Sequence, residues 1–209
     1  MFNVCINCGV YSVEKIIEPE GPFAVCQYCG YKHQFLQLPL FVITGASGSG
    51  KTRAYLELPR KTAQYTFIEC DIFWGPHFDK PEENYRSFRD HCLRVAKNIS
   101  QNGKSVVLCG TALPDGYEIS AERRYFSNIH YLALVCDGDV LEERLRDRSN
   151  WRNCSPEFIN AMKTFNQWIK DNAHKTNPPM TLLDTTHLSI ENTVDCIVNW
   201  LLSCSLFPS

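Results

Sequence analysis

The sequence predicts an α/β fold in which a parallel five-stranded sheet lies between two layers of helices, preceded by a small cysteine-rich unit. Three observations predict it. Apolar segments typical of buried strands alternate with amphipathic helical segments from Leu40 onward. The first of these strands runs directly into a glycine-rich loop, and four cysteines in two matched pairs precede it. We therefore expect two units, residues 1–38 and residues 39–209, with Pro39 at the boundary.

The two cysteine pairs, Cys5/Cys8 and Cys26/Cys29, form the pattern C-x2-C-x17-C-x2-C, which falls within four-cysteine zinc spacing. Each pair can aim two thiolates at one point. Four thiolates close a tetrahedral site with no open position, which is typical of structural rather than catalytic zinc. A redox function is the alternative for either pair taken alone. We predict a zinc ribbon over residues 1–38, whose folding depends largely on the metal because its core is small.

The glycine-rich loop after the first strand matches every fixed position of the phosphate-binding loop G-x-x-x-x-G-K-[ST]. Its glycines let the backbone turn N–H groups toward phosphate oxygens, at the positive end of the following helix. Lys51 can reach the β and γ phosphates, and Thr52 can offer its hydroxyl to Mg²⁺. The expected nucleotide-binding residues are Gly45, Ser47, Gly48, Ser49, Gly50, Lys51 and Thr52. The alternative is a flexible Ser/Gly turn, which the flanking strand and helix patterns disfavour.

The remaining elements follow in alternation, so the chain predicts the three-layer fold of P-loop NTPases. Apolar, β-branched runs predict five strands, at residues 40–43, 65–70, 105–109, 129–136 and 181–183. Apolar residues at steps of three and four, together with capping residues, predict the helices between them. These helices are expected from Lys51 to before Pro59, from Pro81 to Asn102-Gly103, over residues 140–148, from Pro156, and from a cap at Ser189 to the C-terminal region.

The carboxyl ends of the strands are where such sheets bind ligands. Glu69 and Asp71 leave the second strand two residues apart and share one face. One could accept a proton from a substrate hydroxyl, and the other could orient Mg²⁺ or the substrate. We favour Asp71 as the base, with Glu69 as a substrate-binding residue and reserve base. Two solvated acids are the alternative. Trp74 and its aromatic neighbours could stack on a planar base, or could simply pack the loop onto the next helix.

Arginines supply the expected positive charge. Arg144 and Arg148 are four residues apart on one helical face, where they could clamp the transferring phosphoryl group. A solvated, ion-paired helix face is the alternative. Arg123 and Arg124 are weaker candidates for binding a substrate anion.

The composition of the chain limits the kinds of binding partner that we expect. With a formal net charge of −2 over 209 residues, the chain has no overall electrostatic case for nucleic acid or a membrane surface. No apolar run reaches the roughly 20 residues of a membrane span, and Cys5 and Cys8 lie where a secretory signal would need an apolar core. We expect a cytoplasmic protein whose other seven of eleven cysteines are mostly small buried side chains.

Residues 40–204 resemble the small-molecule kinases of the P-loop superfamily, such as adenylate, shikimate and gluconate kinases. The resemblance lies in the phosphate loop, Asp71 after the second strand, the Glu143-Arg144-Leu145…Arg148 segment, and a short fifth strand before a terminal helix. Glu69…Trp74 is also similar to deoxynucleoside kinases, and the chain resembles bacterial nucleoside kinase-like proteins. The family implies ATP- and Mg²⁺-dependent phosphorylation of a small acceptor, with Asp71 at the acceptor hydroxyl and Arg144 and Arg148 in a lid.

Two departures matter. The third strand ends in Gly110-Thr111 where many relatives carry an acid, so Asp71 is a candidate to complete Mg²⁺ coordination. The guanine-selecting N-K-x-D is missing, which favours ATP over GTP. The leading hypothesis is a nucleoside or nucleotide kinase using in-line transfer. The alternatives are a gluconate-like sugar-acid kinase and an ATPase switch that docks a macromolecular partner, a protein rather than nucleic acid, through the ribbon. In a third view the ribbon has a purely structural role.

Overall fold

The structure is a computed structural model that describes residues 3–147 and 154–206. Its larger unit is built on a five-stranded sheet in the order β5-β6-β4-β7-β8, with every neighbouring pair parallel. The strands are β4 (Leu40–Thr44), β5 (Thr66–Glu69), β6 (Val106–Cys109), β7 (Ile129–Val135) and β8 (Thr181–Asp184). The predicted five-stranded parallel sheet is confirmed. Its carboxyl edge carries the glycine-rich loop at the centre, directly after β4.

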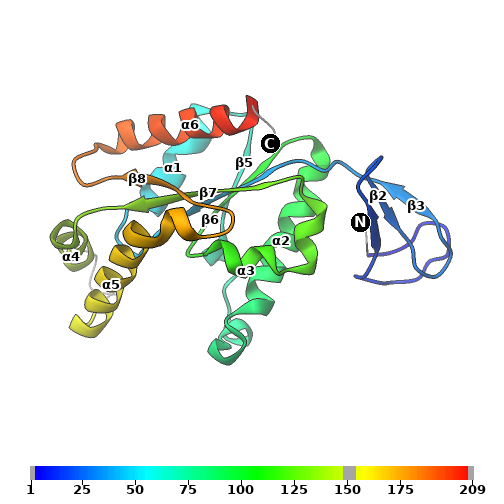
Figure 1. The fold of residues 1–209 in the computed structure, drawn as a ribbon, viewed down its shortest axis with the longest axis horizontal. Coiled ribbons are helices and arrows are strands. Elements are labelled where there is room, and N and C mark those ends of the chain that lie inside the picture. Colours follow the sequence, from blue (N-terminus) through cyan, green and yellow to red (C-terminus); the bar gives the residue numbers. More distant parts are fainter. Residues whose placement is uncertain (1–2, 148–153, 207–209) are drawn as a thin grey trace.

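Helices cover both faces of this sheet (Figure 1). One face carries α1 (Lys51–Lys61) and α6 (Ile190–Leu206), and the other carries α2 (Arg86–Ile99), α3 (Pro114–Glu118) and α5 (Pro156–Asn172). Successive side chains of β4 point to opposite faces of the sheet, and this alternation explains why helices cover both faces. Leu40 and Val42 enter the core beneath α2 and α5, whereas Phe41 and Ile43 enter the core beneath α1 and α6. The short helix α4 (Gly138–Arg146) packs on α5 at one end of the molecule.

Two expected helix boundaries are wrong. Helix α1 continues through Pro59 to Lys61, because the proline lies in the last turn, where its missing N–H removes only one bond. The helix expected from Pro81 begins instead at Arg86. Residues Pro81–Glu83 form a separate 3₁₀ turn, and Asn84 and Tyr85 then take left-handed φ values of 49° and 54°, which no α-helix continues.

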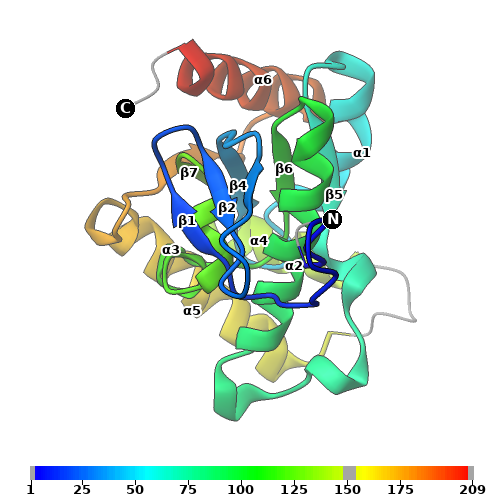
Figure 2. The ribbon, with the colours of Figure 1, turned by 90° about the vertical axis from the view of Figure 1, so that its right-hand side faces the viewer.

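The N-terminal unit is a three-stranded antiparallel sheet of β1 (Ile16–Glu18), β2 (Phe23–Val25) and β3 (Lys32–Gln34). It lies at the opposite end of the molecule from α4 (Figure 1), and Figure 2 views the molecule from its side. Its small apolar core is completed from the larger unit: Ala24 and Phe35 pack against Tyr125, which is 1% exposed.

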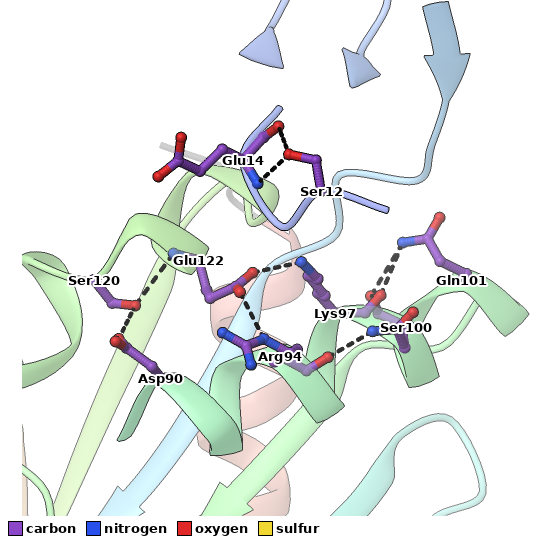
Figure 3. Close-up of polar contacts among 10 residues, drawn as sticks. Ser12, Glu14, Asp90, Arg94, Lys97, Ser100, Gln101, Ser120 and Glu122 are labelled. Atoms are coloured by element: carbon purple, nitrogen blue, oxygen red, sulfur yellow. Dashed lines mark hydrogen bonds and ion pairs between the residues drawn. The ribbon is translucent and has the colours of Figure 1, made fainter. Parts of the chain in front are cut away.

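A buried charge cluster lies beside this junction (Figure 3). Lys97 on α2 is fully buried and donates a 2.5 Å hydrogen bond to Glu122, which also accepts from Arg94 at 3.0 Å. The ammonium of Lys97 lies 4.1 Å from the centroid of the Tyr125 ring. One turn further along the chain, Gln101 exchanges hydrogen bonds with the backbone of Leu36. The 3₁₀ turn that follows α2, Ser100–Asn102, is therefore tied to the N-terminal unit.

Within residues 3–147 and 154–206, no helix combines the length and apolar character that a bilayer crossing requires.

Candidate active site

The glycine-rich loop has the backbone geometry that phosphate binding needs. Gly45 and Gly48 have φ values of 140° and 92°, in the region that favours glycine. A Cβ on Gly45 would lie 2.3 Å from the carbonyl oxygen of Leu134, so only glycine fits there. Ser49 is fully buried, and its hydroxyl oxygen has no hydrogen-bond partner in the described part of the chain. The loop thus leads into the N-terminus of α1 as a backbone cradle for an anion.

The side chain of Lys51 folds back over this cradle. Its Nζ donates to the carbonyl oxygens of Gly45 at 2.6 Å and Ala46 at 2.9 Å. The ammonium therefore already lies above the loop, where a bound phosphate would meet it.

Thr52 is joined to the end of β5. Its hydroxyl donates a 2.9 Å hydrogen bond to Oε1 of Glu69. Glu69, expected among the substrate-binding residues, thus has its carboxylate beside the hydroxyl that P-loops offer to Mg²⁺. A hydroxyl and a carboxylate are both hard oxygen donors, so this pair fits a magnesium ion.

A cavity of about 490 Å³ opens over the loop. Its walls combine the glycine-rich loop with residues that lie at or beyond the carboxyl ends of other strands at the same edge. These include Glu69, Asp71, Gly110, Thr111, Arg144 and Thr185. Cys109 also lines it, but burial raises the pKa of this thiol to about 12, so it is protonated and a poor nucleophile.

Arg144 is held in this cavity by a residue that the sequence analysis did not single out. Its guanidinium donates to the hydroxyl of Thr185 at 3.0 Å and to the carbonyl of Thr185 at 2.8 Å. The Thr185 hydroxyl is in turn 3.0 Å from the carbonyl of Ser49 in the loop. A polar residue directly after the last strand was the available signal. Arg148, the other expected lid arginine, lies outside the described residues.

A second cavity of about 280 Å³ adjoins the first, and Asp71, Gly110 and Thr111 line both. Its other walls come largely from the loop after β5 and the start of α2, and include Trp74, Tyr85, Phe88 and Arg89. The ring of Trp74 lies 5.9 Å from that of Tyr85 and 5.1 Å from that of Phe88, between centroids. The aromatic residues therefore both pack the loop onto α2 and line a cavity.

Arg123 and Arg124 do not reach either cavity. They lie just before β7, at the amino edge of the sheet and so opposite the loop. Arg123 pairs with Glu118 at 2.7 Å, and the guanidinium carbon of Arg124 lies 5.8 Å from the Tyr125 ring centroid, near the N-terminal unit. Their surroundings give no support to the expected role in substrate binding.

The four cysteines of the N-terminal unit come together. The sulfurs of Cys5, Cys8, Cys26 and Cys29 all lie within 4.8 Å of one another. Zinc–sulfur bonds of about 2.3 Å would place the sulfurs of a tetrahedral site about 3.8 Å apart. The Cys5–Cys29 and Cys8–Cys26 sulfur distances of 3.6 and 3.9 Å fit that geometry. The amide of Asn7 donates to Cys29, and this hydrogen bond is the main cause that lowers the Cys29 pKa to about 6.

Comparison with known proteins identifies the fold. No protein-family model matches the sequence, and no curated protein matches it. Solved structures do match. A sugar kinase from Janibacter sp. HTCC2649 superposes with a TM-score of 0.61 and 18% identity, over 78% of this chain and 94% of that one. A shikimate kinase from Acinetobacter baumannii, in complex with shikimate, superposes with a TM-score of 0.55 and 17% identity, over 81% of this chain and 96% of that one. A gluconokinase from Sinorhizobium meliloti 1021 gives 0.52 and 19%, over 76% and 89%.

The chain therefore has the fold of the P-loop small-molecule kinases, as the resemblance in its motifs implied. At this level of identity the likeness defines the fold, and the activity has to be argued from the site.

Proposed function

We propose that the protein is an ATP-dependent phosphotransferase that phosphorylates a small acceptor, with a nucleoside or nucleotide as the leading class. The observation that carries this proposal is the pair of adjoining cavities that share Asp71. The first has the donor machinery of a P-loop, and the second is separate from that loop and lined by aromatic side chains. A simple ATPase has no need of the second cavity.

The residues divide into a donor set and an acceptor set. On the donor side, backbone N–H groups of residues 45–50 and the ammonium of Lys51 would hold the β and γ phosphates. Thr52 and Glu69 would hold Mg²⁺, which neutralises charge on the phosphates when bound. Arg144, already positioned by Thr185, would approach the triphosphate from the α4 side, with Arg148 as a proposed second lid arginine.

On the acceptor side, we assign the role of base to Asp71, which lines both cavities. The acceptor hydroxyl would lose its proton to the Asp71 carboxylate while its oxygen bonds to the γ phosphorus. The bond from that phosphorus to the bridging oxygen breaks, and ADP leaves. Trp74 would stack on the acceptor ring.

We further propose that residues 1–38 form a zinc ribbon and residues 39–209 the kinase domain. Ile6 and Tyr28, one in each cysteine loop, are 75% and 69% exposed. This exposure favours the second candidate function, in which the ribbon docks a protein partner and the P-loop unit acts as an ATP-driven switch.

Measuring ATP consumption against a panel of nucleosides, nucleotides and sugar acids tests the proposal. We expect turnover that depends on one acceptor class and is absent in Lys51→Ala, which controls for contaminating kinases. Turnover with a sugar acid but no nucleoside or nucleotide would move the assignment to the gluconate-like alternative. ATP hydrolysis that is indifferent to every acceptor would favour the switch.

A further inference from the structure

Arg89 is a feature of the second cavity that the proposed function has not yet used. It lies on α2 and is one of the residues that line the cavity. The Nε atom is buried and has no hydrogen-bond partner within the described residues. A buried N–H donor without an acceptor is unfavourable and uncommon in folded proteins. Nε itself is enclosed against α3, so a ligand would pair with the terminal nitrogens of the guanidinium, for which the described residues offer no ion-pair partner.

The neighbouring helix leaves room for this guanidinium. Gly116 lies on α3, and a Cβ there would come within 2.6 Å of Nε and 2.9 Å of Cζ of Arg89. The φ angle of Gly116 is not positive, so the backbone conformation does not require glycine there. Glycine is therefore needed at this position because a larger side chain would collide with Arg89. Arg89 is seated against α3 at the cavity wall, where a preorganised arginine binds anions well.

The second cavity has few charged side chains in its walls. Asp71 and Arg89 are the charged side chains among its lining residues, and no ion pair within 4.0 Å joins them. The remaining walls are mostly aromatic or small. A ligand there would meet a carboxylate at the boundary with the donor cavity and a guanidinium elsewhere on the wall.

We propose that the acceptor carries an anionic group, a carboxylate or a phosphate monoester, and that Arg89 binds it while Asp71 receives the reacting hydroxyl. This inference rests on the proposed function and deepens it. Planar guanidinium groups pair with both anions through two parallel hydrogen bonds. The proposal favours a nucleotide or a sugar acid over a neutral nucleoside or sugar.

Matched acceptor pairs test it, each differing in the anionic group. One pair is D-gluconate and D-glucitol, and the other is a nucleoside and its 3′- or 5′-monophosphate. Each is assayed with Mg²⁺ and ATP in the wild type, Arg89→Gln and Arg89→Lys. Arg86→Gln is the control, because Arg86 lies on the same helix with its side chain 60% exposed. Calorimetric binding of the same compounds, with a non-hydrolysable ATP analogue filling the donor site, is measured in parallel.

We expect the wild type to prefer the anionic member of a pair. Arg89→Gln should raise its KM by about 10- to 100-fold with a smaller change in kcat, and Arg89→Lys should restore part of the loss. The melting temperature of the variants and their KM for the neutral compounds should equal those of the wild type. Equal use of neutral and anionic members, or an equal loss for both in Arg89→Gln, would overturn the proposal.

Different results would overturn the proposed phosphotransferase function and the proposed anion site at Arg89. If no compound is phosphorylated, the proposed function fails. Calorimetric binding of gluconate or a nucleotide that is lost in Arg89→Gln and kept in Arg86→Gln would still support the anion site. An absence of anion binding to the wild type would overturn that as well.

Discussion

The hydroxyl of Thr52 donates a hydrogen bond of 2.9 Å to the carboxylate of Glu69. This bond links the first turn of α1 to the last residue of β5, and it is the basis for the different roles that we propose for two acids close in sequence. In the proposed function, Glu69 belongs to the donor side and would bind Mg²⁺ together with Thr52. Asp71, two residues later, borders both cavities.

Asp71→Asn tests the assignment of the base. The amide cannot take the acceptor proton, so we expect the rate of transfer to fall by about 10²–10⁴-fold. ATP affinity should change little, because Asp71 is not part of the phosphate loop. Rapid-quench measurement of transfer and calorimetric titration of an ATP analogue check the two parts. Near-normal turnover would reject Asp71 and make Glu69 the candidate base.

Glu69→Gln should behave differently. Removing this charge beside Thr52 weakens the proposed metal site, so the Mg²⁺ concentration for half-maximal rate should rise by about 10-fold, as expected for loss of one charged oxygen contact. Titrating Mg²⁺ at fixed ATP in Glu69→Gln and Asp71→Asn makes the comparison. An unchanged Mg²⁺ requirement in Glu69→Gln, or a raised one only in Asp71→Asn, would exchange the two roles.

The parallel sheet and its binding edge were accessible from the sequence, because buried strands, a P-loop and helical periodicity are local patterns. Asp71 and Arg144 could be placed for the same reason, since each follows a strand and parallel strands share their carboxyl edge. Arg123 and Arg124 precede β7, and that position alone assigns them to the opposite edge.

Arg89 was harder to foresee. It lies among polar residues on an amphipathic helix, and its importance comes from two long-range relationships, with Gly116 and with the loop after β5. No periodicity in one sequence encodes such pairs. The start of α2 was also missed, because the left-handed backbone at Asn84 and Tyr85 interrupts an apolar pattern that looks continuous.

Zinc content tests the N-terminal unit. The purified protein should contain about one zinc per chain by elemental analysis, as four thiolates in this geometry imply. Cys26→Ser should lose that zinc and melt at a lower temperature, because the metal contributes to folding. Cys196→Ser is the control, since Cys196 is exposed and outside the cluster. Full zinc retention in Cys26→Ser would contradict the site.

The kinetics of the zinc-depleted protein add a second readout. Unchanged kinetics in the fraction that stays folded would support a purely structural ribbon. A stable protein partner that is captured by the wild type and lost in Cys26→Ser would instead favour docking.

Glu122→Gln tests the buried charge cluster at the junction. Burial lowers the pKa of Lys97 even though Glu122 opposes this, so the ammonium depends on its carboxylate partner. Removing that charge should lower the free energy of unfolding by about 3–5 kcal/mol. Glu57→Gln, which removes an exposed ion pair with Arg60, should cost less than about 1 kcal/mol. Urea unfolding of both variants measures the difference, and similar losses would contradict the account.

The destination of the γ phosphate tests the central claim most directly. The protein is incubated with Mg²⁺, ATP labelled at the γ position and each member of the acceptor panel, and the label is followed by chromatography and mass spectrometry. The account predicts that label moves to one class of small acceptor in the wild type and stays on ATP in Lys51→Ala. Label released only as inorganic phosphate, at the same rate whichever acceptor is present, would contradict it.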